Sequence, residues 1–259
     1  MKKTLLSALI IMLLTPPATA LSAPTGKDLV MPDYYLGHAI ASVLLLAGKL
    51  GYTQYKSVQD AALSQRLTQA KKLILTHPAH RYRFSDFNIV IIQGREGEPN
   101  AFSLGPTIFV TQSLGSALND RQLTAVLAHE IGHSQVAHFL QRIPMPLGAL
   151  VNETASLLKA DKPRPDSLKK FVEMIQADLE TVNLATEMQA DCLAAVQLEK
   201  LYYNGYANKP MDLVDATSAL YGFDVTTAKD DFGDPGIIRA KIIQSQSYKI
   251  TGCGIFTRK

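Results

Sequence analysis

The sequence predicts a domain of the α+β class that is mostly α-helical and contains a small β-sheet. Apolar residues recur at helical spacing through much of the chain, whereas two short runs rich in β-branched residues lie at 87–93 and 107–111. Of the 259 residues, 47% are hydrophobic and 19% are charged. This composition suffices for one sizeable core and argues against disorder and coiled coil.

The first 20 residues have the three-part order of a secretory signal peptide. Two lysines precede an apolar run from Leu5 to Leu14, and prolines and the small residues Ala18-Thr19-Ala20 follow it. The apolar run is roughly ten residues long, whereas a membrane span needs about 20. We therefore expect cleavage after Ala20, an exported protein without a stable membrane span, and one mature domain at residues 21–259.

The net charge bears on the class of partner. It is +3, and two of the positive charges lie on Lys2 and Lys3 in the segment expected to be removed, which leaves about +1. A balance this close to neutral gives no electrostatic reason to expect nucleic acid or an anionic membrane as a partner.

The chain has two cysteines, Cys192 and Cys253. Two are too few for a four-thiolate zinc site, so a metal would have to be held mostly by histidine and carboxylate side chains. Because an exported protein enters an oxidising environment, we expect a disulfide between them. The alternatives are a buried Cys192 with a free Cys253, and a Cys253 thiolate that caps the metal.

Two helices and two strands are expected in the first part of the chain. The apolar stretch Ala39–Leu50 is about a dozen residues long, which favours a buried helix over a membrane span. Between Val58 and Leu75, apolar residues recur at helical spacing among Gln, Arg and Lys, as in a surface helix. Phe87–Gln93 and Thr107–Thr111 should be short strands of one sheet, since turn-rich segments lie around them.

The remainder is predicted to be helical. Asn119 followed by Gln122 forms a capping-box pattern, which opens a helix that should run to about Arg142. Prolines punctuate residues 143–165, which should hold one short helix at most. The further expected helices are a long segment from Asp166 towards Tyr203 and shorter ones at Met211–Tyr221 and Ile237–Gln244.

The most informative residues lie inside the capped helix. His129 and His133 are four residues apart, so on a helix both imidazoles can reach one metal ion. Glu130 then lies beside that ion and does not ligate it. A zinc peptidase needs this arrangement, because the metal lowers the pKa of its water while the neighbouring carboxylate takes the proton. The alternative is an amphipathic helix with two solvated histidines.

A zinc site of this kind requires a third protein ligand and one open position. His138 follows His129 by nine residues, which on a continuous helix places it on the opposite side. No glycine separates it from His133 to allow a turn back, so we expect His138 to pack or to support another ligand.

The acids of the downstream helical segment are the remaining candidates. Glu173, Glu180 and Glu187 recur every seven residues and should share one face, so periodicity does not choose among them. Glu187 differs in one respect, because Asp191 follows it by one turn. A second acid there would hydrogen-bond a metal-bound imidazole and fix its tautomer.

Three segments together resemble a known family. His129–His133 on one helix, Glu187–Asp191 on a later one, and residues 100–114 before the first motif look like the zinc metallopeptidases that include HtpX, the CAAX prenyl endopeptidase and the periplasmic BepA-like enzymes. The resemblance covers about residues 100–191. It implies a zincin-like core that binds one Zn²⁺, with His129, His133 and Glu187 as ligands, Glu130 as general base and Asp191 behind a ligand histidine.

The resemblance has further implications for the substrate and for the C-terminal region. It implies that Asn100, Ala101 and Phe102 form an edge strand over the zinc, to which a substrate strand adds by backbone hydrogen bonds. Many members carry a His-Pro pair before an arginine, whereas this chain has Asp234-Pro235 before Arg239. Arg239 is therefore a candidate catalytic charge stabiliser. The oxyanion donor stays open among Tyr202, Tyr203, Tyr206 and Tyr221.

We therefore expect a zinc endopeptidase of the bacterial periplasm, and the resemblance implies misfolded or misassembled envelope proteins as its substrates. Three alternatives remain open. The first is a zinc-bound chaperone-like or regulatory binder whose proteolysis is latent or self-inhibited. The others are a structural zinc module without an open site and a zinc hydrolase that acts on other bonds.

Overall fold

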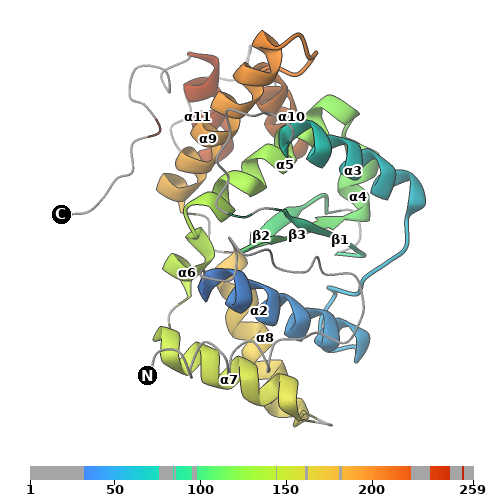
Figure 1. Ribbon diagram of the computed structural model, residues 1–259, viewed down its shortest axis with the longest axis vertical. Helices are drawn as coiled ribbons and strands as arrows, with labels where there is room; N and C mark the ends of the chain where they lie inside the picture. The colour runs from blue at the N-terminus through green and yellow to red at the C-terminus, as the bar shows by residue number, and fades with distance from the viewer. Residues whose placement is uncertain are drawn as a thin grey trace, which may run out of the picture.

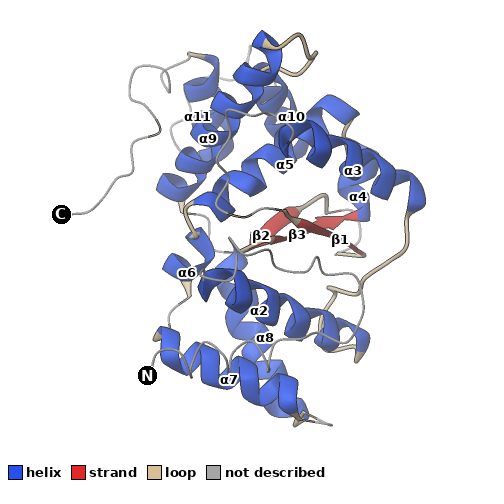
Figure 2. Ribbon diagram, viewed as in Figure 1, coloured by secondary structure: helices blue, strands red, loops and turns tan. Residues whose placement is uncertain are grey.

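A three-stranded sheet lies between two groups of helices (Figure 1). The computed structural model describes residues 32–75, 84, 86–94, 98–143, 145–160, 163–180, 183–222, 234–245 and 253. The expected signal peptide lies outside the described residues. Within them, helices far outnumber strands (Figure 2), so the predicted α+β, mostly helical fold class is confirmed.

The sheet consists of β1 (Asn88–Ile92), β2 (Ala101–Leu104) and β3 (Thr107–Thr111) in the order β1-β3-β2. β1 runs parallel to β3, and β2 runs antiparallel to it. Every residue of β3 is buried, as expected of a central strand. β2 lies at an edge of the sheet, because no other strand in the described part of the chain pairs with it. The two strands predicted from β-branched runs are confirmed.

Each face of the sheet packs on its own hydrophobic core, because successive side chains of a strand point to opposite faces. Ile108 and Val110 of β3 belong to the core with α3 (Ala61–Leu75) and α5 (Asp120–Gln135). Phe109 belongs to the core with α2 (Pro32–Lys49). No helix among the described residues is long and apolar enough to cross a membrane, and the apolar stretch near residue 44 is buried against the sheet as predicted.

The other helices complete these two layers. They are α4 (Gln112–Ala117), α6 (His138–Arg142), α7 (Leu147–Lys159), α8 (Pro165–Glu180), α9 (Leu184–Tyr203), α10 (Met211–Tyr221) and α11 (Pro235–Gln244). The helices predicted near 211–221 and 237–244 are confirmed, and the proline-punctuated stretch holds one helix of 13 residues, longer than expected.

The helix predicted from Asn119 begins as expected but ends early. Both halves of the capping box are formed, since the Asn119 side chain accepts from the Gln122 backbone and the Gln122 side chain accepts from the Asn119 backbone. The helix ends at Gln135, and Ala137 then has a left-handed conformation with φ of 52°. It is the only non-glycine residue with positive φ in the described ranges. A new short helix, α6, starts directly after it.

The long helical segment predicted from Asp166 to Tyr203 is two helices. Asn183 begins the second one, because its side chain accepts hydrogen bonds from the backbone of the first turn of α9. Glu173 and Glu180 therefore lie on α8 and Glu187 on α9. The prediction that the three acids share one helix face was wrong, because they lie on two separate helices.

Candidate metal centre

Two packed helices, α5 and α9, carry the residues predicted to bind metal. Gly132 of α5 allows this close packing, because a Cβ atom at this position would lie 2.8 Å from the carbonyl oxygen of Ala190 on α9. Ser134, further along α5, donates a hydrogen bond of 2.6 Å to the carbonyl of Gly105 in the turn between β2 and β3. Helix α5, which carries His129–His133, is therefore fixed both to α9 and to the turn between β2 and β3.

The structure brings the three predicted ligands together. The Nε2 atoms of His129 and His133 lie 3.0 Å apart. Glu187 faces both, with Oε2 3.2 Å from His129 Nε2 and Oε1 3.3 Å from His133 Nε2. One ligand atom from each residue lies within 4.8 Å of the other two. Two imidazole nitrogens this close to one carboxylate fit a shared cation, and two nitrogens with one oxygen are a donor set that suits zinc.

A carboxylate and a guanidinium support His129. Its Nδ1 lies 2.8 Å from Oδ1 of Asp191, close in distance although not aligned as a full hydrogen bond. Arg239 holds Asp191 through two bonds, from Nε to Oδ2 at 2.7 Å and from Nη2 to Oδ1 at 2.9 Å. Arg239 Nη1 also lies 3.1 Å from Glu187 Oε2. The predicted place of Asp191 behind a ligand histidine matches this geometry.

A neutral pair of side chains supports His133. Its Nδ1 lies 2.7 Å from Nδ1 of His138, and the Nε2 of His138 lies 2.9 Å from Oε1 of Gln189 on α9. A metal-binding His133 carries its proton on Nδ1, so it donates to His138, and His138 in turn donates to the Gln189 amide oxygen.

The predicted position of His138 was wrong, although its predicted supporting role agrees with these contacts. A continuous helix would place His138 on the far side, whereas the left-handed Ala137 turns the chain back and brings the rings of His133 and His138 together. Sequence reasoning gave no indication of Gln189. A polar residue between Glu187 and Asp191 was the only available signal.

The charges of the site stabilise one another. Burial lowers the pKa of His129, but the charge and close contact of Asp191 and the contact with Glu187 outweigh burial and raise it to about 10. Burial raises the pKa of Asp191, but Arg239 and His129 together bring it down to about 2. Burial likewise opposes ionisation of Glu187, and hydrogen bonds from His129 and His133 hold its pKa far below the usual range. Both carboxylates are therefore ionised at neutral pH.

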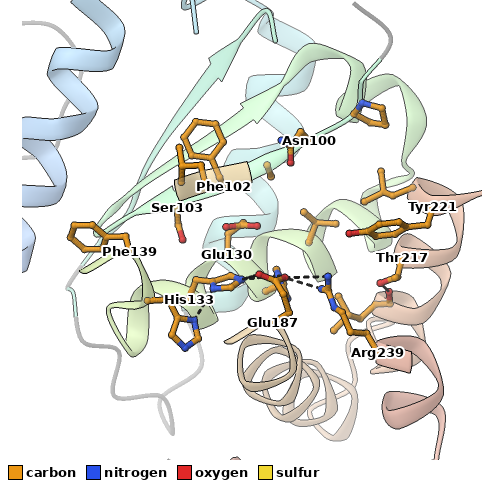
Figure 3. A pocket seen from close by; sticks show the side chains of 18 residues that line it. Asn100, Phe102, Ser103, Glu130, His133, Phe139, Glu187, Thr217, Tyr221 and Arg239 are labelled. Carbon is orange, nitrogen blue, oxygen red and sulfur yellow. Dashed lines mark hydrogen bonds and ion pairs between the residues drawn. The ribbon is translucent and has the colours of Figure 1, made fainter. Parts of the chain in front are cut away.

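A cavity of about 300 Å³ opens over the three ligands. Glu130 lies in its wall between β2 and Glu187, as the general base of a peptidase would (Figure 3). Of the four candidate tyrosines only Tyr221 lines the cavity, and it points inward from α10 (Figure 3). All four tyrosines are exposed, and Tyr202, Tyr203 and Tyr206 lie outside its lining. Arg239 lines the cavity too, but its contacts with Asp191 and Glu187 make it first of all a partner of carboxylates.

The Asp234-Pro235 pair has a local structural role. The Asp234 side chain accepts hydrogen bonds from the backbone of Gly236 and Ile237, and Pro235 occupies the first turn of α11. The pair therefore starts the helix that carries Arg239 to the site.

Asn100, Ala101 and Phe102 all line the cavity, but their backbone N–H and C=O groups do not all point to the same side of the strand. The backbone N–H of Thr111 donates to the carbonyl of Asn100 at 2.9 Å. Hydrogen-bonded and non-bonded residue pairs alternate in an antiparallel ladder. The backbone N–H and C=O groups of Asn100 and Phe102 therefore point towards β3. The N–H and C=O groups of Ala101 and Ser103 therefore point out from the edge. Ser103, not named in the sequence-based prediction, joins Ala101 as a residue able to bind an added strand.

Cys192 and Cys253 form a disulfide, with Cα atoms 5.5 Å apart. Cys192 directly follows Asp191 on α9. The bond therefore holds Cys253 next to the helix that supplies the third ligand.

Comparison with known proteins identifies the family. The model of Peptidase family M48 matches residues 76–209, just over half of the chain. The crystal structure of S. mikatae Ste24p matches with 15% sequence identity and a TM-score of 0.39 over 92% of this chain. The match covers 62% of that protein, so this chain spans less than two thirds of its length. No curated protein sequence matches the chain. From the family match, the chain belongs to peptidase family M48, a family of zinc metallopeptidases.

Proposed function

We propose that this family M48 protein is an endopeptidase of the bacterial periplasm, and that it binds one Zn²⁺ per chain and hydrolyses misfolded or misassembled envelope proteins. The observation that carries the proposal is the position of Glu130, in one cavity with three converging metal donors and beside the edge strand β2, whose outer side pairs with no strand of the described residues. Among zinc sites, this combination is suited to hydrolysis of an extended polypeptide.

The residues of the cavity have distinct roles in the proposed reaction. His129, His133 and Glu187 would hold Zn²⁺, which supplies a Lewis acid and a water of lowered pKa. Glu130 takes a proton from the attacking water and later delivers it to the leaving amine. The hydroxyl of Tyr221 faces the cavity and would donate to the carbonyl oxygen as its charge develops. Ala101 and Ser103 hold the substrate backbone extended across this group.

Two observations support export. The first 20 residues have the order of a signal peptide, and the cysteine pair is joined in a disulfide, which forms and persists in oxidising compartments. Misfolded envelope proteins are proposed as the substrates because an edge strand binds extended backbone, which unfolded segments expose along their length.

Cleavage of an unfolded protein by the purified mature chain tests this proposal. We expect cleavage that a chelator abolishes, that added Zn²⁺ restores, and that Glu130→Gln lacks while it still binds one equivalent of zinc. Stoichiometric zinc binding without cleavage by the unsubstituted chain would overturn the peptidase assignment. It would favour the alternative of a zinc-bound chaperone-like or regulatory protein that binds polypeptides.

Two proline substitutions test strand addition. Ala101→Pro removes an N–H that points out from the edge, so peptide cleavage should fall about tenfold or more while zinc binding and thermal stability are kept. Phe102→Pro is the control, because it removes an N–H that bonds β3 and should lower the melting temperature. Full activity in a folded Ala101→Pro variant would show that this edge does not bind substrate.

A further inference from the structure

A second cavity lies on the other side of the edge strand. It has a volume of about 200 Å³, and Asn100, Ala101, Phe102 and Leu179 line both cavities. Its own walls include Tyr55, Gln54 and Thr111, none of which lines the metal cavity. The proposed reaction makes no use of this space.

The two cavities lie on opposite faces of β2. Ala101 packs on the core that contains the motif helix α5. Phe102 packs on the other core, where its ring stacks on Phe109 at a centroid distance of 4.8 Å and lies 5.1 Å from the ring of Tyr55. Because of this alternation, the side chain of Ala101 lies on the face of β2 towards the metal donors. The side chain of Phe102 lies on the opposite face, next to the ring of Tyr55.

A strand added to β2 would follow the same alternation. Its backbone would bond Ala101 and Ser103, whose N–H and C=O groups point out from the edge. Side chains of neighbouring strands that lie opposite each other point to the same face. The residues opposite Ala101 and Ser103 would therefore face the metal, and the residue between them, opposite Phe102, would point towards the second cavity.

We infer that the second cavity is a specificity pocket that receives one side chain of the bound polypeptide, and that this side chain is leucine, methionine or phenylalanine. This inference rests on the proposed peptidase function. Tyr55, Phe102 and Leu179 form the apolar part of the pocket lining, which favours burial of an apolar group. Gln54, Glu98, Asn100 and Thr111 form the polar part, and the carboxylate of Glu98 disfavours an acidic side chain. The pocket volume of about 200 Å³ lies below the ~300 Å³ at which small-molecule sites begin, so its size suits a single side chain.

The pocket would make the enzyme select the residue type at one position of the substrate polypeptide, whereas the backbone contacts accept any sequence. Buried apolar residues are exposed when a protein unfolds, so a requirement for one such residue in an extended segment directs the enzyme to unfolded chains. Folded proteins bury both the backbone and the side chain that binding requires.

The test maps cleavage sites in a peptide library by mass spectrometry. For the unsubstituted chain, we expect one position at a fixed distance from the cleaved bond to favour Leu, Met or Phe over Ala or Asp by about tenfold or more. Leu179→Trp and Gln54→Trp, which both narrow the pocket, should shift that position to Gly and Ala, and Leu179→Ala should raise the preference for Phe. Leu179 also lines the metal cavity whereas Gln54 does not, so a shift shared by both Trp variants assigns the change to the pocket. Leu158→Trp is the control, because Leu158 is half-buried against the same core but lines neither cavity.

A second measurement separates failure of the pocket from failure of the peptidase. Binding of the same peptides to zinc-loaded Glu130→Gln, followed by fluorescence anisotropy, should weaken about tenfold when the favoured residue is changed to Asp. That difference should vanish in the Glu130→Gln, Leu179→Trp double variant. Cleavage with one unchanged profile in both Leu179 variants would overturn the pocket and leave the peptidase intact. Absence of cleavage together with Leu179-dependent binding would overturn the peptidase and leave the pocket.

Discussion

His129 and His133 stand on one helix and face one site, yet the groups behind them differ in charge. Behind His129 lies an ionised pair, Asp191 with Arg239, whereas behind His133 lies a neutral chain through His138 to Gln189. Both arrangements contact the ring at Nδ1 and direct Nε2 towards the metal site. The comparison shows that orientation needs only a hydrogen-bond acceptor, whereas a buried charge also changes the affinity of the ring for protons.

The charge balance of the site follows from this difference. Asp191 and Arg239 neutralise each other, which leaves the carboxylate of Glu187 to offset part of the charge of a divalent metal. Glu187 is also the one ligand that contacts both histidines. The loss of zinc affinity on removal of Asp191 or of His138 can therefore be compared with the loss on removal of Glu187, which contacts both histidines.

The largest effect is expected from Glu187→Ala. Zinc affinity should fall by more than the ~100-fold that marks loss of a supporting residue, because a ligand itself is removed. Glu173→Ala is the control, since the Glu173 side chain is 59% exposed and its ion-pair partner is Lys169. Competition with a chelating dye measures both affinities. Equal loss in the two variants would show that Glu187 is not a ligand.

The charged support should matter next. Asp191→Ala should lower zinc affinity by about 10- to 100-fold and also lower the melting temperature, because Arg239 loses its buried partner. Asp212→Ala is a matched control, since Asp212 is equally buried and pairs with Arg121 at 3.3 Å, away from the metal ligands. Asp212→Ala should lower stability without affecting zinc affinity. An unchanged zinc affinity in Asp191→Ala would show that Asp191 does not support His129.

The neutral support should give a smaller effect. His138→Ala should lower zinc affinity by about tenfold, because a neutral hydrogen bond is weaker than a charge-assisted one. His138→Gln keeps an acceptor and should lose less. His38→Ala, at a buried histidine hydrogen-bonded to Thr107 at 3.0 Å, controls for loss of a buried ring. If His138→Ala lowered affinity more than Asp191→Ala, the order of the two supports would be reversed.

The last prediction concerns the protons released on zinc binding and not the loss of a support. The pKa of His129 is raised to about 10, so at pH 7 this ring carries a proton that must leave before Nε2 can bind metal. Zinc binding should release about one proton, and affinity should rise about tenfold per pH unit from neutral pH towards pH 10. In Asp191→Asn the charge that raises this pKa is gone, so the number of protons released and the rise of affinity with pH should both be smaller. Calorimetry in buffers of different ionisation enthalpy measures the release, and equal release in both proteins would contradict the charge argument.

Local sequence patterns were sufficient for some parts of the fold and of the site. The capping box at Asn119 and the run Thr107–Thr111 depend on a few neighbouring residues, and both form as predicted. His129 and His133 need only helical spacing to converge. β2 was harder to predict from pattern, because Ala101–Leu104 contains no β-branched residue and its strand conformation depends on β3.

The remainder depended on contacts between distant segments. The left-handed conformation of Ala137 costs roughly 1–3 kcal/mol and no residue at that position announces it. It is compensated by the buried contacts of His138, which is 1% exposed, with His133 and Gln189. The start of a separate helix at Asn183 had a visible signal, a good N-cap residue, which the helical periodicity on both sides obscured.

The close packing of α5 on α9 at Gly132 has a consequence for the life of the chain. Two ligands come from one helix and the third from the other, so the donor set exists only after these helices have docked. Metal uptake and tertiary folding are therefore a single linked equilibrium. A nascent or unfolded chain carries no hydrolytic centre, and the protein would become a protease only at the place where it completes folding.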